Sequence, residues 1–347
     1  MRLKIGNKTI GDGAPAFIVA ELSANHGNKF EIAADTVRAM RDSGADAVKL
    51  QTYTADTITL NCDNDYFKIK QGTIWDGKNL HKLYEEASMP WEWQPKLKKI
   101  ANDLGMECFS TPFDNTAVDF LEKMDVPAYK IASFEITDIP LIEYTASKGK
   151  PMILATGVAE LSDIEDAIAA CRRMGNNQIA VLKCTSSYPA PLREINLATI
   201  PDIGRRLKAI AGLSDHTIGS AIPIASCALG AKIIEKHFIL DKKIGGPDAS
   251  FSMEPEDFRK MVSSIREVEE SLGKVNYELT EKASKSRDFC RSLFVAENIE
   301  RGELFTTDNI RSVRPGFGLP PKHLNAILGK RAKKHLEKGT PLNWMHI

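Results

Sequence analysis

The chain has 347 residues, of which 43% are hydrophobic and 27% charged, a composition typical of soluble globular proteins. Lys plus Arg and Asp plus Glu each number 46, so no basic excess indicates a nucleic-acid partner and no acidic excess indicates disorder. We find no apolar run long enough to span a membrane, no signal-peptide pattern at the N-terminus and no C-x-x-C pair among the 6 cysteines. We therefore expect a cytoplasmic protein that binds neither nucleic acid nor membrane.

Eight short apolar runs recur along the chain, each followed by a polar tip and then by a stretch with helical spacing. The runs cover residues 17–21, 47–51, 107–111, 129–133, 152–156, 179–185, 210–216 and 233–237. After the fifth run, for example, Ile164, Ala167 and Cys171 share one helical face. Near-continuous apolar strands indicate a parallel sheet that is buried on both faces.

Eight strand-then-helix units in roughly 270 residues predict an α/β fold, specifically a (β/α)8 TIM barrel. A doubly wound open sheet is the alternative, but it normally has fewer strands and a glycine-rich first turn. No G-x-G-x-x-G motif follows the first run.

Two stretches interrupt this pattern. Residues 54–90, which include Trp75, form a long connection that is either a lid or substrate wall, or a surface loop with an aromatic anchor. After Gly273 the chain becomes polar and lysine-rich, and short extended runs such as 293–296 follow. We predict a catalytic barrel over residues 1–275, a linker over 276–290 and a small β-rich domain over 291–347. A domain of that size is expected to dock on the barrel or on a partner subunit.

Polar side chains end all eight runs, and in a (β/α)8 barrel these ends build the active site. The last two runs end in His216 and His237, which are 237 − 216 = 21 positions apart, about the length of one crossover between parallel strands. Two such imidazoles can converge on one metal ion, without selecting among Mn, Fe, Co, Ni and Zn. The alternative is that both histidines only cap strands through hydrogen bonds.

Lys49 and Lys130 lie within apolar strands, where a lysine must be paired, neutral or bound to an anion. Hydroxyl groups follow nearby strands at Thr111, Ser133, Ser186 and Ser214. Together these residues favour a phosphate, or a phosphate with a carboxylate, as the ligand. The alternative is a structural network in which the lysines pair with Glu21, Glu135 or Glu235.

A Schiff-base aldolase also places a lysine on a barrel strand, but that mechanism needs one lysine and no metal. Two lysines with hydroxyl groups and a histidine pair favour anion binding with Lewis-acid catalysis. Glu21, at the end of the first run, is the candidate acid or base. A binding protein without catalysis is a further alternative, which does not explain the combination of Glu21, His216 and His237.

Several motifs, in order along nearly the whole chain, resemble the sialic acid synthase family. They are residues 20–27 (AELSANHG), 49–53 (KLQTY), 109–113 (FSTPF), 129–133 (YKIAS), 184–189 (CTSSYP), 212–216 (GLSDH), 235–238 (EKHF) and 246–248 (GPD). The stretch at 314–316 (RPG) resembles the antifreeze-like (SAF) domain that these enzymes carry. The resemblance implies a TIM barrel followed by a SAF domain.

The resemblance also implies an activity, a cofactor and a partner. Family members condense phosphoenolpyruvate with an acetamido sugar and release phosphate by carbon–oxygen cleavage, after C3 of phosphoenolpyruvate attacks the open-chain aldehyde. They use a divalent metal, so we expect Mn, with Mg or Co as alternatives. They form homodimers in which the SAF domain of one subunit closes over the barrel of its partner.

Residue roles are carried over by position from the matching motifs. His216 and His237 would hold the metal, and Glu21 would act as acid or base near the forming bond. The residues expected to bind phosphoenolpyruvate are Lys49, Thr111, Lys130, Ser133, Ser186 and Ser214, although Ser186 stands where sialic acid synthases tend to have asparagine. The residues expected to contact the sugar are Gln51, Glu135, Tyr188, Asp248 and, from the partner subunit, Arg314.

Three local features resemble the pseudaminic acid synthase branch of the family: Leu22, residues 72–76 with 83–86, and residues 246–254. Ala249 stands where sialic and legionaminic acid synthases tend to have a histidine. We therefore expect 2,4-diacetamido-2,4,6-trideoxy-β-L-altropyranose as the sugar. N-acetylneuraminate or legionaminate synthesis is the alternative, and a Schiff-base aldolase or lyase is a more distant one.

Overall fold

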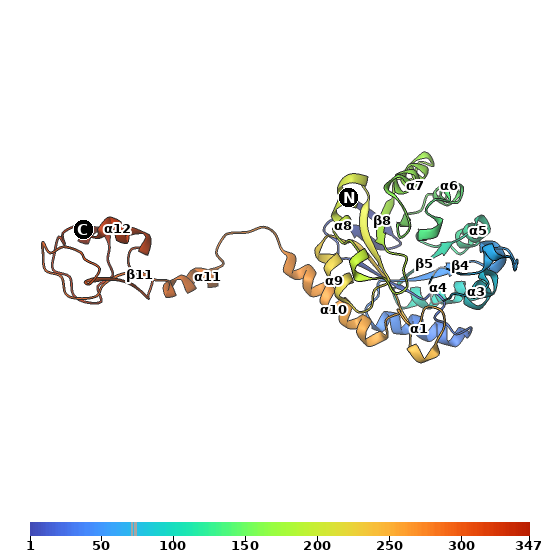
Figure 1. The fold of residues 1–347 in the computed structure, drawn as a ribbon, viewed down its shortest axis with the longest axis horizontal. Helices are drawn as coiled ribbons and strands as arrows, with labels where there is room; N and C mark the ends of the chain where they lie inside the picture. Colours follow the sequence, from blue (N-terminus) through green and yellow to red (C-terminus); the bar gives the residue numbers. More distant parts are fainter. Residues whose placement is uncertain (71, 73–74) are drawn as a thin grey trace. The chain divides into compact units, whose positions relative to one another are not determined.

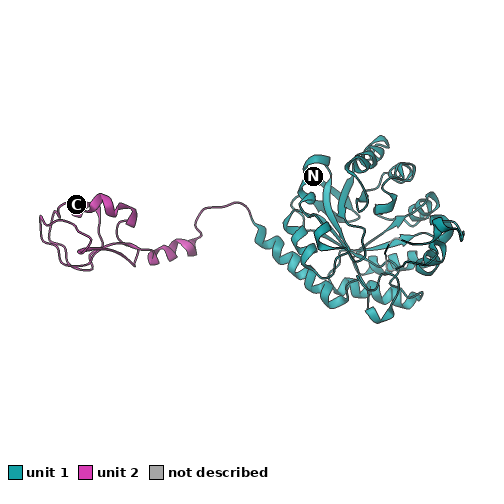
Figure 2. Ribbon diagram, viewed as in Figure 1, with its two compact units in different colours: residues 1–273 teal, residues 274–347 magenta. Residues whose placement is uncertain are grey.

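The structure is a computed structural model that describes residues 1–70, 72 and 75–347. The chain divides into two compact units, residues 1–273 and residues 274–347 (Figure 2). Each unit has its own hydrophobic core, so each is described by itself.

The first unit is a closed barrel of eight parallel strands with helices around its outside (Figure 1). The strands are β3 (Phe17–Glu21), β4 (Ala47–Thr52), β5 (Glu107–Pro112), β6 (Tyr129–Ile131), β7 (Met152–Ala155), β8 (Ile179–Cys184), β9 (Ile210–Asp215) and β10 (Ile233–His237). They neighbour one another in chain order, and β10 closes the barrel by pairing with β3. The predicted TIM barrel is confirmed, and the open-sheet alternative is wrong.

Helices connect successive strands and cover the barrel. They are α1 (Phe30–Asp42), α4 (Gln94–Asp103), α5 (Asn115–Lys123), α6 (Ile139–Ala146), α7 (Leu161–Arg173), α8 (Thr199–Asp202), α9 (Ala221–Ala228) and α10 (Pro255–Leu272). Each packs one apolar stripe against the strands, as α1 does with Ala33, Val37 and Met40. Asp114 caps α5 by accepting hydrogen bonds from two backbone N–H groups of its first turn.

A hairpin absent from the sequence-based prediction precedes the barrel. Its strands, β1 (Arg2–Ile5) and β2 (Lys8–Gly11), pair antiparallel and bury Leu3, Ile5 and Ile10 in the barrel core. The turn contacts Glu107 at the start of β5, because the Asn7 N–H donates to its carboxylate at 2.8 Å. Gly6 has φ +56° and a Cβ there would lie 2.1 Å from Glu107 Oε2. The hairpin therefore packs at the amino end of the barrel, and the backbone of its turn favours glycine.

The described part of the connection between β4 and α4 contains the helices α2 (Ala55–Ile58) and α3 (Leu80–Ala87) and short 3-10 turns at Asp65–Phe67 and Trp91–Trp93. Within the predicted stretch 72–76, Thr73 and Ile74 lie outside the described residues.

The second unit contains a two-stranded antiparallel sheet, β11 (Ser292–Val295) with β12 (Ile310–Val313). Two helices accompany it, α11 (Glu281–Ser286) and α12 (Leu324–Ile327), and α11 lies inside the stretch predicted as a linker. Leu293, Phe305 and Leu336 belong to its small core. Across the described parts of both units, no helix is long and apolar enough to cross a membrane.

Candidate active site

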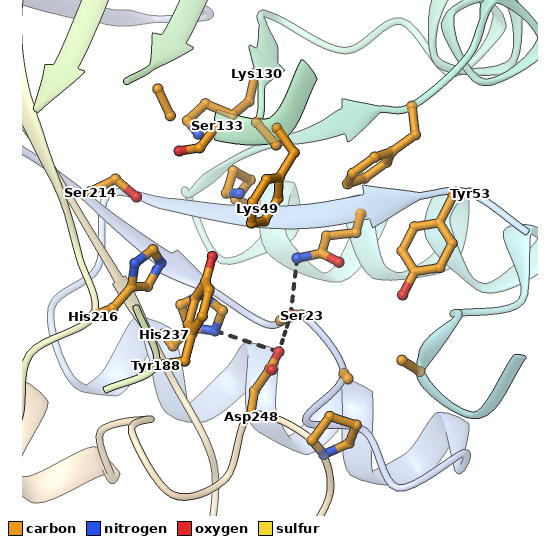
Figure 3. A pocket seen from close by; sticks show the side chains of 18 of the residues that line it. Ser23, Lys49, Tyr53, Lys130, Ser133, Tyr188, Ser214, His216, His237 and Asp248 are labelled. Atoms are coloured by element: carbon orange, nitrogen blue, oxygen red, sulfur yellow. Dashed lines mark hydrogen bonds and ion pairs between the residues drawn. The ribbon is translucent and has the colours of Figure 1, made fainter. Parts of the chain in front are cut away.

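One cavity is lined by residues from the carboxyl ends of the barrel strands and from the loops that follow them (Figure 3). It brings together nine of the residues predicted from the sequence: Lys49, Gln51, Lys130, Ser133, Tyr188, Ser214, His216, His237 and Asp248. Parallel strands end at one edge of a barrel, so residues distant in the sequence meet there.

Two buried lysines that line the cavity are paired with two buried carboxylates, of which Glu235 also lines it and Glu21 does not; we call these four the floor residues. Lys49 Nζ lies 2.7 Å from Glu21 Oε2 and 3.3 Å from Glu235 Oε1, and Lys130 Nζ lies 3.8 Å from the same Glu235 oxygen. The lysines are therefore paired before any ligand arrives, as in the structural alternative. Their partners are Glu21 and Glu235, and no ion pair to Glu135 occurs among the described residues.

Burial and charge perturb the floor residues differently. Burial, assisted by Glu235 and opposed by Lys49, raises the pKa of Glu21 to about 7. Burial alone would raise the pKa of Glu235 too, but Lys130 and Lys49 outweigh it and lower that pKa. Burial also lowers the pKa of Lys130 despite Glu235. Glu21 can therefore hold or release a proton near neutral pH, whereas Glu235 stays ionised.

Hydroxyl groups and one backbone N–H surround the lysines. Thr111 Oγ1 lies 3.4 Å from Lys49 Nζ, and Ser214 Oγ donates to Glu235 Oε1 at 3.1 Å. The Gly157 N–H donates to Ser133 Oγ at 3.0 Å. A Cβ at Gly157 would lie 2.0 Å from Ser186 Oγ and 2.7 Å from Ser133 Oγ. The absence of a side chain at Gly157 therefore allows both serine hydroxyl groups to lie close to this glycine, whose N–H orients Ser133.

The two histidine rings line the cavity next to each other in an edge-on arrangement, with centroids 5.3 Å apart and planes 63° apart. His216 Nδ1 lies 3.0 Å from the Thr185 carbonyl, which can only accept, so Nδ1 carries a proton. Burial opposes the charged ring, but Cys184, the Thr185 carbonyl and Asp215 outweigh it and raise the pKa of His216. Burial, with His216 and Lys49 nearby, lowers the pKa of His237 well below its ordinary value and keeps it neutral. His237 is thus in the neutral state that a metal ligand requires, whereas His216 would release a proton from Nε2 on binding a metal. No set of three or more metal-ligating side chains occurs within residues 1–70, 72 and 75–347.

A buried ion pair joins the strands that carry the histidines. β9 and β10 pair so that Glu235 faces Ser214 and Lys236 faces Asp215. Lys236 Nζ lies 2.5 Å from Asp215 Oδ2, and each side chain is only 1% exposed. Neither residue lines the cavity, because alternate side chains of a strand point to opposite faces. The pair therefore holds the two strands together on the side facing away from the cavity, directly next to His216 and His237 in the sequence.

A hydrogen-bonded chain runs from Glu21 to Asp248. Gln51 Nε2 donates to Glu21 Oε1 at 3.0 Å and to Ser23 Oγ at 2.9 Å. Ser23 Oγ in turn donates to Asp248 Oδ2, which lies 3.7 Å from His237 Nδ1 (Figure 3). One side of the cavity is thus a continuous polar network.

Aromatic side chains form another part of the cavity wall. Trp75 and Tyr188 have ring centroids 5.5 Å apart, and Tyr53 lies 5.1 Å from Phe113. Trp75, Leu83, Tyr84 and Ala87 all come from the connection between β4 and α4 and line the cavity. Residues 54–90 therefore supply a cavity wall, and the surface-loop interpretation does not describe them.

Five predicted residues do not line the cavity directly. Glu21 and Thr111 contact Lys49, and Ser186 lies beside Gly157. Glu135 lies in a 3-10 turn after β6, and burial raises its pKa to about 7. Arg314 belongs to the second unit, where it is exposed directly after β12.

Residues missed by the sequence-based prediction include Ser23, Tyr53 and Cys184. Ser23 and Tyr53 lie within motifs quoted for the resemblance, but nothing in their spacing assigns them a place in a cavity. Cys184, to which the sequence-based prediction assigns no role, lines the cavity with Sγ 3.8 Å from His216 Nδ1. Burial opposes its thiolate, but His216, Ser133 and Lys130 lower its pKa to about 6.

The match to family models decides the family. The model described as "NeuB family" matches residues 36–277, and the model described as "SAF domain" matches residues 291–347. The chain belongs to the NeuB family. The predicted resemblance to sialic acid synthases is thereby confirmed, together with the SAF domain.

Individual relatives of this NeuB family chain cover nearly its whole length. A pseudaminic acid synthase from Helicobacter pylori is 46% identical over 330 residues, covering 95% of this chain and 97% of the relative. A pseudaminic acid synthase from Campylobacter jejuni is 42% identical over 340 residues, covering 98% of both. The crystal structure of a spore coat polysaccharide biosynthesis protein from Bacillus subtilis superposes with a TM-score of 0.69 at 35% identity, covering 100% of this chain and 99% of that one.

Proposed function

We propose that the chain condenses phosphoenolpyruvate with 2,4-diacetamido-2,4,6-trideoxy-β-L-altropyranose and releases phosphate, acting as a transferase. The observation that carries the proposal is one cavity in which two buried lysines and two buried histidines meet below an aromatic wall. The lysines can bind the phosphate of a substrate, and the aromatic wall can pack against the apolar 6-deoxy position of a sugar. Relatives named pseudaminic acid synthase, 46% and 42% identical, support this choice of sugar.

The floor residues bind and hold the phosphate. Lys49 and Lys130, with the hydroxyl groups of Thr111, Ser133, Ser186 and Ser214, supply the donors that an anion needs. An arriving dianion competes with Glu235 for both lysines. C3 of phosphoenolpyruvate attacks the sugar aldehyde, water adds at C2, and the lysines stabilise phosphate as the carbon–oxygen bond breaks.

His216 and His237 would hold a divalent metal, for which we propose Mn with Mg or Co as alternatives, and which supplies Lewis-acid activation of the aldehyde. Glu21, with its pKa near 7, donates a proton to the aldehyde oxygen as it becomes a hydroxyl group, acting from beside Lys49 and Gln51. Gln51, Tyr188 and Asp248 line the cavity and contact the sugar, and we propose that Glu135 reaches it from the turn that begins with the lining residues Ser133 and Phe134. We also propose a homodimer in which Arg314 of one subunit reaches the sugar bound by its partner.

The test is phosphate release from phosphoenolpyruvate with each candidate sugar, with and without EDTA. We expect the diacetamido altrose sugar to be the fastest substrate and EDTA to abolish turnover until Mn²⁺ is restored. Faster turnover of N-acetylmannosamine would instead indicate a sialic acid synthase. Activity that survives EDTA, together with borohydride trapping of a lysine adduct, would indicate a Schiff-base enzyme.

A further inference from the structure

Ser23 combines an unfavourable backbone conformation with a position in the cavity wall. It follows β3 with φ +48°, in the left-handed region that favours glycine. Its side chain is nonetheless almost completely buried and lines the cavity. Glycine would adopt this conformation more easily. A serine held in it within a site therefore indicates that its side chain has a function.

The Ser23 hydroxyl is the only described link between Gln51 and Asp248. It accepts from Gln51 Nε2 at 2.9 Å and donates to Asp248 Oδ2 (Figure 3). Gln51 Nε2 also donates to Glu21 Oε1 at 3.0 Å, so both of its hydrogens are used. The amide is thereby fixed with Oε1 as the atom left for a ligand. The carboxylate of Asp248, which has only acceptor atoms, is held beside it.

We propose that Ser23 is a positioning residue that holds Gln51 and Asp248 as a pair of hydrogen-bond acceptors for the acetamido N–H and hydroxyl groups of the sugar. The inference deepens the proposed function and rests on it, since it concerns the sugar side of the same cavity. Without the hydroxyl, the Gln51 amide can rotate and Asp248 loses a charge-assisted hydrogen bond. Phosphoenolpyruvate binding depends on Lys49 and Lys130 and is left intact.

The experiment compares Ser23→Gly with a matched glycine substitution elsewhere. Lys208 has φ +51°, is exposed, and precedes β9 at the amino end of the barrel. Both Ser23→Gly and Lys208→Gly relieve left-handed strain, so both are expected to keep or raise the melting temperature. Only Ser23→Gly is expected to raise the KM for the sugar, by about tenfold for one lost hydrogen bond to a charged group. The KM for phosphoenolpyruvate is expected to stay within about twofold of wild type, a change worth well under one hydrogen bond.

A double-mutant cycle tests whether Ser23 acts through Asp248. On an Asp248→Ala background, Ser23→Gly is expected to raise the sugar KM less than on the wild-type background, because the interaction with Asp248 is already absent and only that with Gln51 remains. Ser23→Ala, which also lacks the hydroxyl, should reproduce the sugar effect without relieving the strain. A sugar KM equal to wild type in Ser23→Gly, or equal losses for both substrates, would overturn the proposal.

The kinetic comparison uses whichever acetamido sugar the wild-type protein turns over fastest. If that sugar is not the diacetamido altrose, the proposed substrate is wrong, while the Ser23 effect is still measured on an acetamido group. If the diacetamido altrose is the substrate and Ser23→Gly behaves like wild type, only the role of Ser23 is refuted.

Discussion

Replacing Lys236 with methionine should strongly destabilise the barrel. The substitution keeps most of the aliphatic length but removes an ammonium that lies 2.5 Å from Asp215 Oδ2 and also donates to the Thr217 carbonyl. Among the residues that the structure describes, Asp215 then keeps only its hydrogen bonds from the Thr217 N–H at 3.1 Å and from Thr217 Oγ1 at 3.0 Å. With both side chains only 1% exposed, water cannot replace the missing charge.

The magnitude follows from the burial of the pair. Removing one partner of a buried ion pair costs about 3–5 kcal/mol. The first unit has 273 residues. At about 2.1 cal/mol/K per residue its entropy of unfolding is about 0.6 kcal/mol/K, so a loss of about 4 kcal/mol lowers the Tm by about 7 °C.

The assay is differential scanning calorimetry of the full chain, in which the barrel transition is followed. Asp215→Asn combined with Lys236→Met removes both charges, so the double variant is expected to recover at least half of the loss. Lys260→Met is the matched control, because Lys260 pairs with Glu256 at 2.9 Å on the exposed surface of α10 and its loss should leave the Tm unchanged. A Tm of Lys236→Met close to wild type, or a double variant less stable than the single one, would refute the reasoning.

His237→Ala should weaken Mn²⁺ binding by at least about tenfold in equilibrium dialysis, and unchanged affinity would exclude the histidine pair as the metal site. Lys130→Met should raise the KM for phosphoenolpyruvate more than about tenfold, because a charge-assisted contact is lost, with little change in the sugar KM. Burial raises the folded-state pKa of Glu135 from 4.5 to about 7, so its contribution to stability is fully present below pH 4.5 and is lost as the pH rises through 7. Glu135→Gln should therefore match wild type at pH 4.5 and exceed it by up to about 3 kcal/mol at pH 8 in urea unfolding, whereas equal stability at both values would contradict the burial of that carboxyl. Mixing Arg314→Ala and His237→Ala subunits should restore activity if Arg314 acts in its partner's site, and a mixture as inactive as its components would exclude that exchange.

The barrel could be predicted because its strands are buried on both faces. The runs at 17–21 and 233–237 match β3 and β10 to the residue, since continuous apolar sequence between polar tips leaves little choice of boundary. The run at 129–133 overestimated β6, which ends at Ile131 because Ser133–Glu135 turns into a 3-10 helix. The hairpin β1–β2 was missed because its polar side chains hide the alternation of Leu3 and Ile5.

The sequence was sufficient to predict most of the residues that form the site, but not which of them pair with one another. Sequence alone leaves three possible carboxylate partners for the lysines, and only the order of the strands places Glu21 and Glu235 beside Lys49. Glu135 was an equal candidate, yet it lies beyond the end of β6. The backbone angle of Ser23 and the hydrogen bonds of its hydroxyl group depend on residues more than 200 positions away, such as Asp248. No local pattern encodes such an arrangement.

The register between β9 and β10 limits how this part of the chain can change in length. Ser214 and His216 point into the cavity with Glu235 and His237, while Asp215 and Lys236 point away from it. Because side chains alternate with a period of two, deleting or inserting one residue within either strand exchanges the two sets. Lys236 would then enter the cavity, and a histidine would be turned into the surrounding helices. Insertions and deletions should therefore be tolerated only in the connection that contains α9, where they leave the phase of both strands unchanged.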